Sequence, residues 1–85
     1  MSLRLRSTVL TTETDYGTVL FDERNGDYYQ LNPSGALVVR TLLDGGNADD
    51  AVHTLVTEFN VDTARAQHDV TALLQQLRSS RLVTS

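Results

Sequence analysis

Hydrophobic and polar residues alternate at the start of the chain and recur at helical spacing further on. Leu3, Leu5 and Val9 alternate with Arg4, Arg6 and Thr8. This period of two is typical of a strand with one buried side. The residues ETDYG that follow favour a turn, so the sequence predicts a first strand before them.

A β-hairpin is predicted next. The stretches TVLFDER and DYYQL flank Asn25-Gly26, a pair suited to a two-residue type I′ turn because both turn positions need positive φ. That turn sets a register in which charged and aliphatic residues face one another across the strands. The expected pairs are Arg24 with Asp27, Asp22 with Tyr29, and Leu20 with Leu31.

Three apolar stripes at helical spacing follow the hairpin. Capping and stop residues set the limits of these helices. Asn32 and Pro33 begin the first and Gly45 ends it, Asn47 begins the second and Asn60 ends it, and the third runs from Asp62 or Thr63 to about Ser79. The closing RLVTS is predicted to be a short extended piece.

Strands grouped before helices favour an α+β fold over a parallel βαβ sheet. The last two helices are separated only by NVD, which resembles a helix-turn-helix. We therefore expect one domain over residues 1–85, a winged helix-turn-helix with a three-stranded antiparallel sheet followed by three helices.

Composition narrows the classes of function. The chain has 85 residues, a formal charge of −4 and no cysteine. No broad basic surface is available to neutralise nucleic-acid phosphates, and thiolate chemistry and disulfides are excluded. Neither a signal-peptide core nor a membrane-length apolar run is present, so the sequence predicts a cytoplasmic protein without a membrane partner.

No catalytic or metal-binding pattern stands out. His53 and His68 lie in different predicted helices without the spacing of a metal site. Asp49 and Asp50 fall in a first helical turn, where the helix dipole favours acids, so capping explains them. No nucleophile, base and orienting acid occur together. We expect a non-enzyme without metal or cofactor.

The stretch DYYQL has none of the lysine or proline that usually protects a sheet edge. An edge strand beside a helix forms a groove in which an extended peptide can add a strand. In the two-residue hairpin, Tyr28 and Gln30 would direct their backbone N–H and C=O groups outward. The predicted peptide-binding residues are Asp27, Tyr28, Tyr29, Gln30, Leu31, Asp69, Leu73, Gln76 and Leu77.

Two alternatives remain at this stage. Some of these apolar residues can instead be core, which is the better interpretation for Leu31, Val70 and Leu74. The helix-turn-helix pattern also leaves a DNA-binding regulator as an alternative. The third helix has only Arg65 and Arg78, at opposite ends, and it carries acidic residues that repel phosphates, so this alternative is less favoured.

The order of these motifs resembles the PqqD-like domains, the recognition elements that bind precursors of ribosomally made, modified peptides. The matching positions are Leu20, Asp22, Gly26, Tyr28, Tyr29, Leu31, Asn32, Gly35, Asp44, Gly45, Asp69 and Val70. The family often has glycine before the final Leu-hydrophobic pair, where this chain has Arg81.

This resemblance implies that a leader peptide binds as an extra strand against the third strand, beside the third helix. The chain is most similar to the stand-alone recognition proteins of lasso-peptide pathways. There the implied partners are a separate leader peptidase, which is a cysteine protease, and the cyclase that closes the ring. The alternative within the family is the peptide chaperone of pyrroloquinoline quinone biosynthesis.

Overall fold

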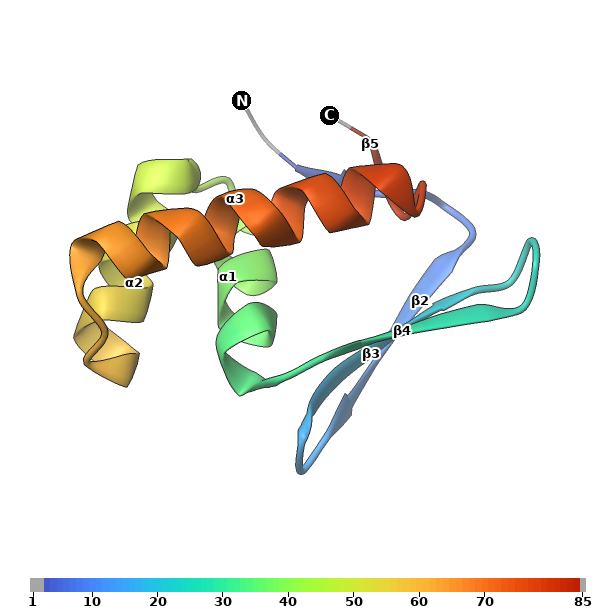
Figure 1. The fold of residues 1–85 in the computed structure, drawn as a ribbon. Helices are drawn as coiled ribbons and strands as arrows, with labels where there is room; N and C mark the ends of the chain where they lie inside the picture. Colours follow the sequence, from blue (N-terminus) through green and yellow to red (C-terminus); the bar gives the residue numbers. More distant parts are fainter. Residues whose placement is uncertain (1–2, 85) are drawn as a thin grey trace.

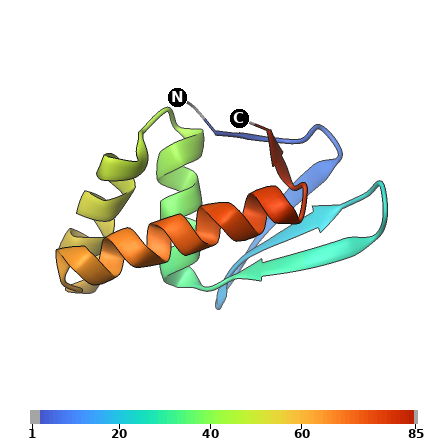
Figure 2. The same ribbon diagram turned by 45° about the horizontal axis from the view of Figure 1, so that its top comes forward.

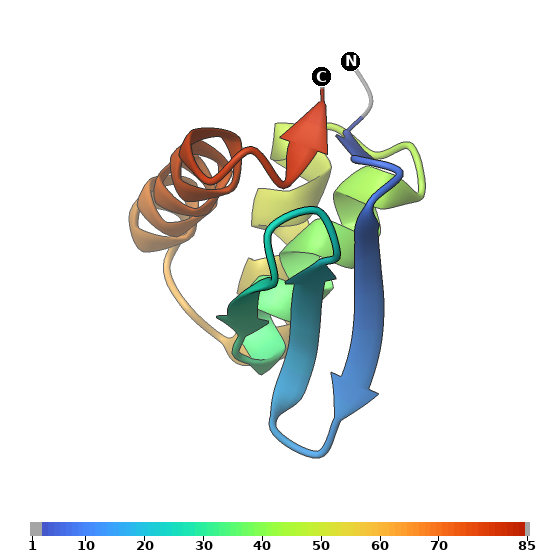
Figure 3. The same ribbon diagram turned by 90° about the vertical axis from the view of Figure 1, so that its right-hand side faces the viewer.

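A three-stranded antiparallel sheet with three helices on one side forms the body of the protein (Figures 1 and 3). The computed structural model describes residues 3–84. Its elements are β1 (Arg4–Leu5), β2 (Val9–Thr14), β3 (Gly17–Asp22), β4 (Asp27–Leu31), α1 (Pro33–Leu43), α2 (Ala48–Phe59), α3 (Thr63–Ser79) and β5 (Val83–Thr84). The predicted α+β arrangement is confirmed.

The first strand differs from its prediction. The alternating segment at the N-terminus is interrupted by a turn, and only Arg4–Leu5 is extended there, paired with β5 in a separate two-stranded sheet. The three-stranded sheet begins with β2, of which every residue except Val9 is exposed. β2 is thus the first strand of the predicted three-stranded sheet, but it begins at Val9 and runs to Thr14, into the predicted turn. An edge strand that buries so little has no apolar alternation to mark its bounds. The two-stranded sheet brings the two ends of the described chain together (Figure 2).

The predicted hairpin exists, but its register is wrong by two residues. Asp22 pairs with Asp27, Leu20 with Tyr29 and Thr18 with Leu31. The loop is Glu23–Gly26, in which only Gly26 has a positive φ, at 76°. A type I′ turn needs positive φ at two positions, so this loop is of another type.

Hydrogen bonds inside the loop explain the longer connection. The Asp22 carboxylate accepts from the backbone N–H of Arg24 and from its guanidinium, both at 3.0 Å. The Asn25 side chain accepts from the backbone N–H of Asp27 at 3.1 Å.

The shift in register does not change which face of the sheet each side chain occupies. Because side chains alternate with a period of two, a shift by two residues leaves each one on its predicted face of the sheet.

The predicted helix limits are confirmed by their caps. The side chains of Asn32, Asn47 and Asp62 each accept a backbone N–H from the first turn of their helix, at 2.8 Å. At the end of α1, Gly45 has a φ of 99°. Its N–H and that of Gly46 bond back into the last turn, as in a Schellman motif.

The core lies between the sheet and the helices. Leu31 and Val70 are each 2% exposed, as predicted, and Leu74 packs partly buried against them. The other buried apolar side chains come from every layer of the fold, and they include Leu20, Val38, Val39, Leu42, Ala51, Leu55, Ala66, Leu77, Leu82 and Val83. These side chains come from the sheet and from all three helices, so the core holds the two layers together.

Candidate functional site

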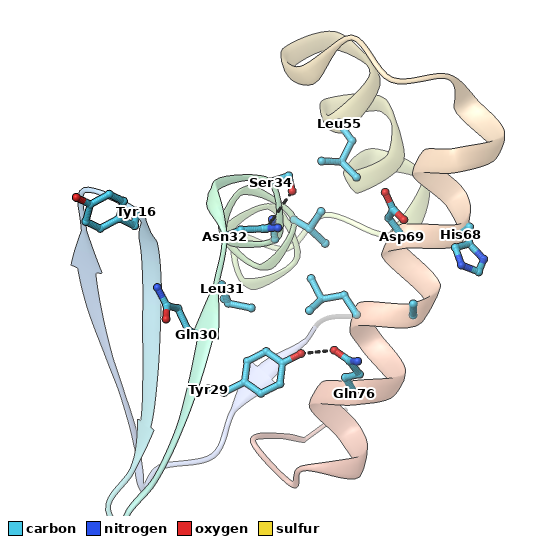
Figure 4. Close-up of a pocket in the computed structure, with 14 residues that line it drawn as sticks. Tyr16, Tyr29, Gln30, Leu31, Asn32, Ser34, Leu55, His68, Asp69 and Gln76 are labelled. Carbon is cyan, nitrogen blue, oxygen red and sulfur yellow. Dashed lines mark hydrogen bonds between the residues drawn. The ribbon is translucent and has the colours of Figure 1, made fainter.

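A groove of about 550 Å³ runs between β4 and α3 (Figure 4). Its apolar floor contains Leu31, Val38, Leu55 and Leu73. Polar groups line its walls. The full lining is Tyr16, Tyr29, Gln30, Leu31, Asn32, Ser34, Gly35, Val38, Leu55, His68, Asp69, Ala72, Leu73 and Gln76.

One wall of the groove is the free edge of the sheet. Within residues 3–84, β4 pairs only with β3, in the strand order β2-β3-β4. The Glu23 N–H donates to the Thr8 carbonyl at 2.9 Å, so the polar backbone groups of Glu23 face the β2 side. These groups alternate in direction along an antiparallel strand, so those of Asp22, Leu20 and Thr18 face β4.

On β4, these residues pair with Asp27, Tyr29 and Leu31. The backbone N–H and C=O groups of Asp27, Tyr29 and Leu31 therefore point toward β3. The N–H and C=O groups of Tyr28 and Gln30 consequently point out from the sheet, as the sequence predicted. The two-residue register shift left this polarity unchanged because it preserved the alternation.

The other wall is one face of α3. Asp69, Leu73 and Gln76 are spaced four and three residues apart, so they share that face. A glycine keeps the floor beneath Leu73 open. A methyl group built on Gly35 would lie 3.7 Å from a methyl carbon of Leu31 and 3.7 Å from one of Leu73. Leu31 and Leu73 thus converge over the helix backbone and leave a shallow apolar depression.

A hydrogen bond crosses the groove at one end. The Tyr29 hydroxyl donates to the Gln76 side-chain oxygen, joining β4 to α3. Figure 4 shows this contact near one end of the labelled residues, with Asp69 further along α3. The open part of the groove therefore lies on the Leu31, Leu73 and Asp69 side of this bridge.

The structure brings most of the predicted site residues together. Those that line the groove are Tyr29, Gln30, Leu31, Asp69, Leu73 and Gln76. Tyr28 is 74% exposed and lies on the outer face of the sheet, where its ring contacts Phe21 with centroids 4.9 Å apart. Asp27 is exposed beside the loop, and Leu77 is fully buried in the core, so neither lines the groove.

Sequence reasoning missed several lining residues. His68 and Ala72 neighbour Asp69 and Leu73 on α3, so a wider helical stripe would have included them. Tyr16 comes from the β2–β3 turn, and Leu55 comes from α2. No local pattern marks these two, because only tertiary packing brings their elements to the groove.

The described part of the chain offers little for other chemistry. Among residues 3–84, no group of three or more His, Cys, Asp or Glu side chains is placed to hold a metal ion. No helix in that range has the length and apolar character needed to cross a membrane. The arrangement of the groove is suited to holding an extended chain.

Comparisons with known proteins identify the family of this fold. The sequence model of the family described as coenzyme PQQ synthesis protein D (PqqD) matches residues 17–83. A solved structure described as lasso peptide synthetase B1 complexed with the leader peptide is 38% identical, with a TM-score of 0.92 and full coverage of both chains.

A second structure, TbiB1 in complex with the TbiA(beta) leader peptide, shares the fold. It is 22% identical, with a TM-score of 0.85, and the match covers 96% of this chain and 95% of that one. No curated protein matches the sequence. The family match over most of the chain, together with the full-length structural relative, shows that this protein belongs to the PqqD family of peptide recognition domains.

Proposed function

We propose that this protein binds the leader of a ribosomally made precursor peptide as an added strand at the β4 edge, beside α3. The free edge over an apolar groove is the observation that carries the proposal. The structural relative with 38% identity supports it, because that protein was solved with a leader peptide.

Strand addition divides the work of binding between backbone and side chains. The outward N–H and C=O groups of Tyr28 and Gln30 pair with the leader backbone, which gives affinity without regard to sequence. Every second leader side chain then turns toward α3, into the depression between Leu31 and Leu73. Specificity comes from how well those side chains fit.

In this proposal the protein carries out no chemistry itself. It delivers the bound leader to a separate leader peptidase, a cysteine protease of a lasso-peptide pathway, and the cyclase acts afterwards. Binding as a strand fixes the backbone of the otherwise mobile leader, so the cleavage site reaches the peptidase in a reproducible position. The similarity to a lasso peptide synthetase component supports this assignment.

The second candidate is presentation of the precursor in pyrroloquinoline quinone synthesis. The description of the matching family favours it, since that family takes its name from coenzyme PQQ synthesis. Both candidates use the same groove. They differ in the precursor, so the precursor encoded beside this protein distinguishes them.

The sharpest test replaces an outward N–H with proline. Gln30→Pro removes one donor from the β4 edge and places a ring where the leader strand would lie. The loss of one hydrogen bond costs about 0.5–1.5 kcal/mol, and the obstructing ring adds to it, so we expect leader affinity to fall about tenfold or more. Fluorescence anisotropy with the labelled leader of the neighbouring precursor measures this loss.

A matched control lies on the opposite edge of the sheet. Thr11 on β2 pairs with Leu20, and the same alternation turns its N–H away from β3. Thr11→Pro should therefore fold and bind leader like the wild type, whereas Tyr29→Pro should damage the sheet. A folded Gln30→Pro variant with wild-type affinity would refute strand addition.

Mass spectrometry of the same mixtures should show unchanged leader, and a cleaved product would refute the non-catalytic role.

A further inference from the structure

The groove carries a single formal charge. Of the groove-lining residues in the described chain, Asp69 alone has a charged side chain, since the others are apolar, aromatic, polar or histidine. Within residues 3–84 no arginine or lysine lines the groove, so it offers no permanently charged partner for an acidic peptide side chain. The electrostatic preference of the groove is therefore set by one carboxylate, on the α3 wall.

The carboxylate of Asp69 is available to a ligand. Its ion pair within residues 3–84 is with Arg65, one turn earlier on α3, where Nε and Oδ2 are 4.0 Å apart. The Arg65 and Asp69 side chains are 74% and 52% exposed, respectively. An exposed pair at this distance contributes about 0–1 kcal/mol, so a better-placed cation displaces Arg65 at little cost.

The spacing along α3 matches that of an extended peptide. Asp69 and Leu73 are four residues apart, which is about 6 Å along a helix at a rise of 1.5 Å per residue. Side chains on one face of a strand repeat every two residues, or about 6.6 Å. A peptide side chain over Leu73 thus places the residue two positions away beside Asp69.

Building on the proposed function, we propose that the peptide bound in this groove carries arginine or lysine beside Asp69. This basic residue lies two positions from an apolar residue that packs between Leu31 and Leu73. Its side chain forms a charge-assisted hydrogen bond with the Asp69 carboxylate. The recognised ligand is thus an extended peptide with alternating apolar and basic residues. The protein's net charge of −4 also attracts such a peptide from solution.

Selection from a random twelve-residue peptide library on the immobilised protein tests this proposal and does not require the natural leader. We expect enriched peptides with a basic residue two positions from a large apolar one. Selection on Asp69→Asn should lose the basic preference while keeping the apolar one. Asp49→Asn, which removes an exposed acid at the start of α2 outside the groove, should select the same peptides as the wild type.

A binding cycle then measures the coupling. The best selected peptide and its variant with glutamine at the basic position are titrated against wild type and Asp69→Asn. The basic peptide should lose about three- to tenfold in affinity with Asp69→Asn, and the glutamine variant should bind both proteins equally. Raising the salt concentration should weaken only the binding of the basic peptide to the wild type, because only this combination keeps both charges.

The outcomes separate the peptide preference from strand addition itself. Enriched peptides that bind at the Gln30 edge but lack a basic preference, or keep it on Asp69→Asn, would overturn this inference and leave strand addition intact. A selection that enriches no peptide would overturn the proposed function, and this inference with it.

Discussion

Arg81 occupies an unusual backbone position at the end of α3. Its φ is 58°, in the left-handed region that residues other than glycine seldom adopt. The Arg81 N–H bonds to the Arg78 carbonyl and the Leu82 N–H to the Leu77 carbonyl, both at 3.1 Å, which is the Schellman pattern. Leu77 and Leu82 are both buried, so the fold holds Arg81 in place from either side.

Arg81→Gly should stabilise the protein. Glycine adopts this conformation without the clash of a Cβ atom, so we expect a gain of about 0.5–1 kcal/mol after the added freedom of the unfolded chain is subtracted. Thermal unfolding followed by circular dichroism should show a higher melting temperature. Ser80→Gly is the control, because Ser80 has a φ of −81° and should gain nothing. A lower melting temperature for Arg81→Gly would contradict this account.

At the level of elements, one face of α3 packs into the core and another lines the groove. Ala66, Val70 and Leu77 are buried against the core, whereas Asp69, Leu73 and Gln76 line the groove. The two faces follow from the helical period, since residues three and four apart lie on one side. The same helix therefore anchors the fold and forms one wall of the groove.

Leu73→Ala should weaken leader binding while the protein stays folded. Leu73 is partly buried and forms the groove floor with Leu31, so truncation removes contact area for a peptide side chain and should cost about 1–2 kcal/mol of binding. Calorimetric titration with the leader measures this. Tyr28→Ala should cost less, because Tyr28 lies on the outer face of β4. A larger loss for Tyr28→Ala than for Leu73→Ala would place the main contact outside the groove.

At the scale of the whole molecule, stability rests on a small core and on one buried carboxylate. A chain of this length buries only about 60–65% of its unfolded surface, so single interactions matter. Asp22 is 1% exposed and forms an ion pair with Arg24 at 3.0 Å. Next to it, the Glu23 N–H donates to the Thr8 carbonyl at 2.9 Å, which joins the β3–β4 loop to the segment before β2.

The pKa of the Asp22 carboxyl is lower than its ordinary value. Burial raises this pKa, but the Arg24 backbone N–H, the Thr8 hydroxyl and the Arg24 guanidinium together outweigh burial and lower it. The Thr8 hydroxyl exerts this effect without a hydrogen bond of regular geometry. Because the folded state favours the carboxylate, Asp22 stabilises the fold above the pKa of the unfolded chain, about 3.9.

The pH dependence of unfolding should reveal this contribution. At pH 7, Asp22→Asn should have a lower melting temperature than the wild type. The difference should shrink as pH falls below about 4 and through the folded pKa, because the wild type then loses its carboxylate. Melting temperatures of both proteins between about pH 2.5 and 7 test the sign. Curves that stay parallel over this range would show that Asp22 is not the titrating group.

Local chemistry in the sequence was sufficient for much of this protein. Capping residues such as Asn32 and Asn47 bond within their own helices, so their roles are readable from a few neighbours. The outward polarity of Tyr28 and Gln30 was also predictable, because it depends on alternation alone and survived the shift in register. The family pattern follows from the same ordered set of local signals.

Tertiary structure decided the rest. The position of β2 depended on pairing with β3, since its mostly exposed residues carry no apolar alternation. The hairpin register depended on the buried Asp22, whose bonds to Arg24 stabilise a longer loop than Asn25-Gly26 suggests. The groove combines Tyr16, Leu55 and Asp69 from elements far apart in sequence, and only the packing of α2 and α3 with the sheet brings them together.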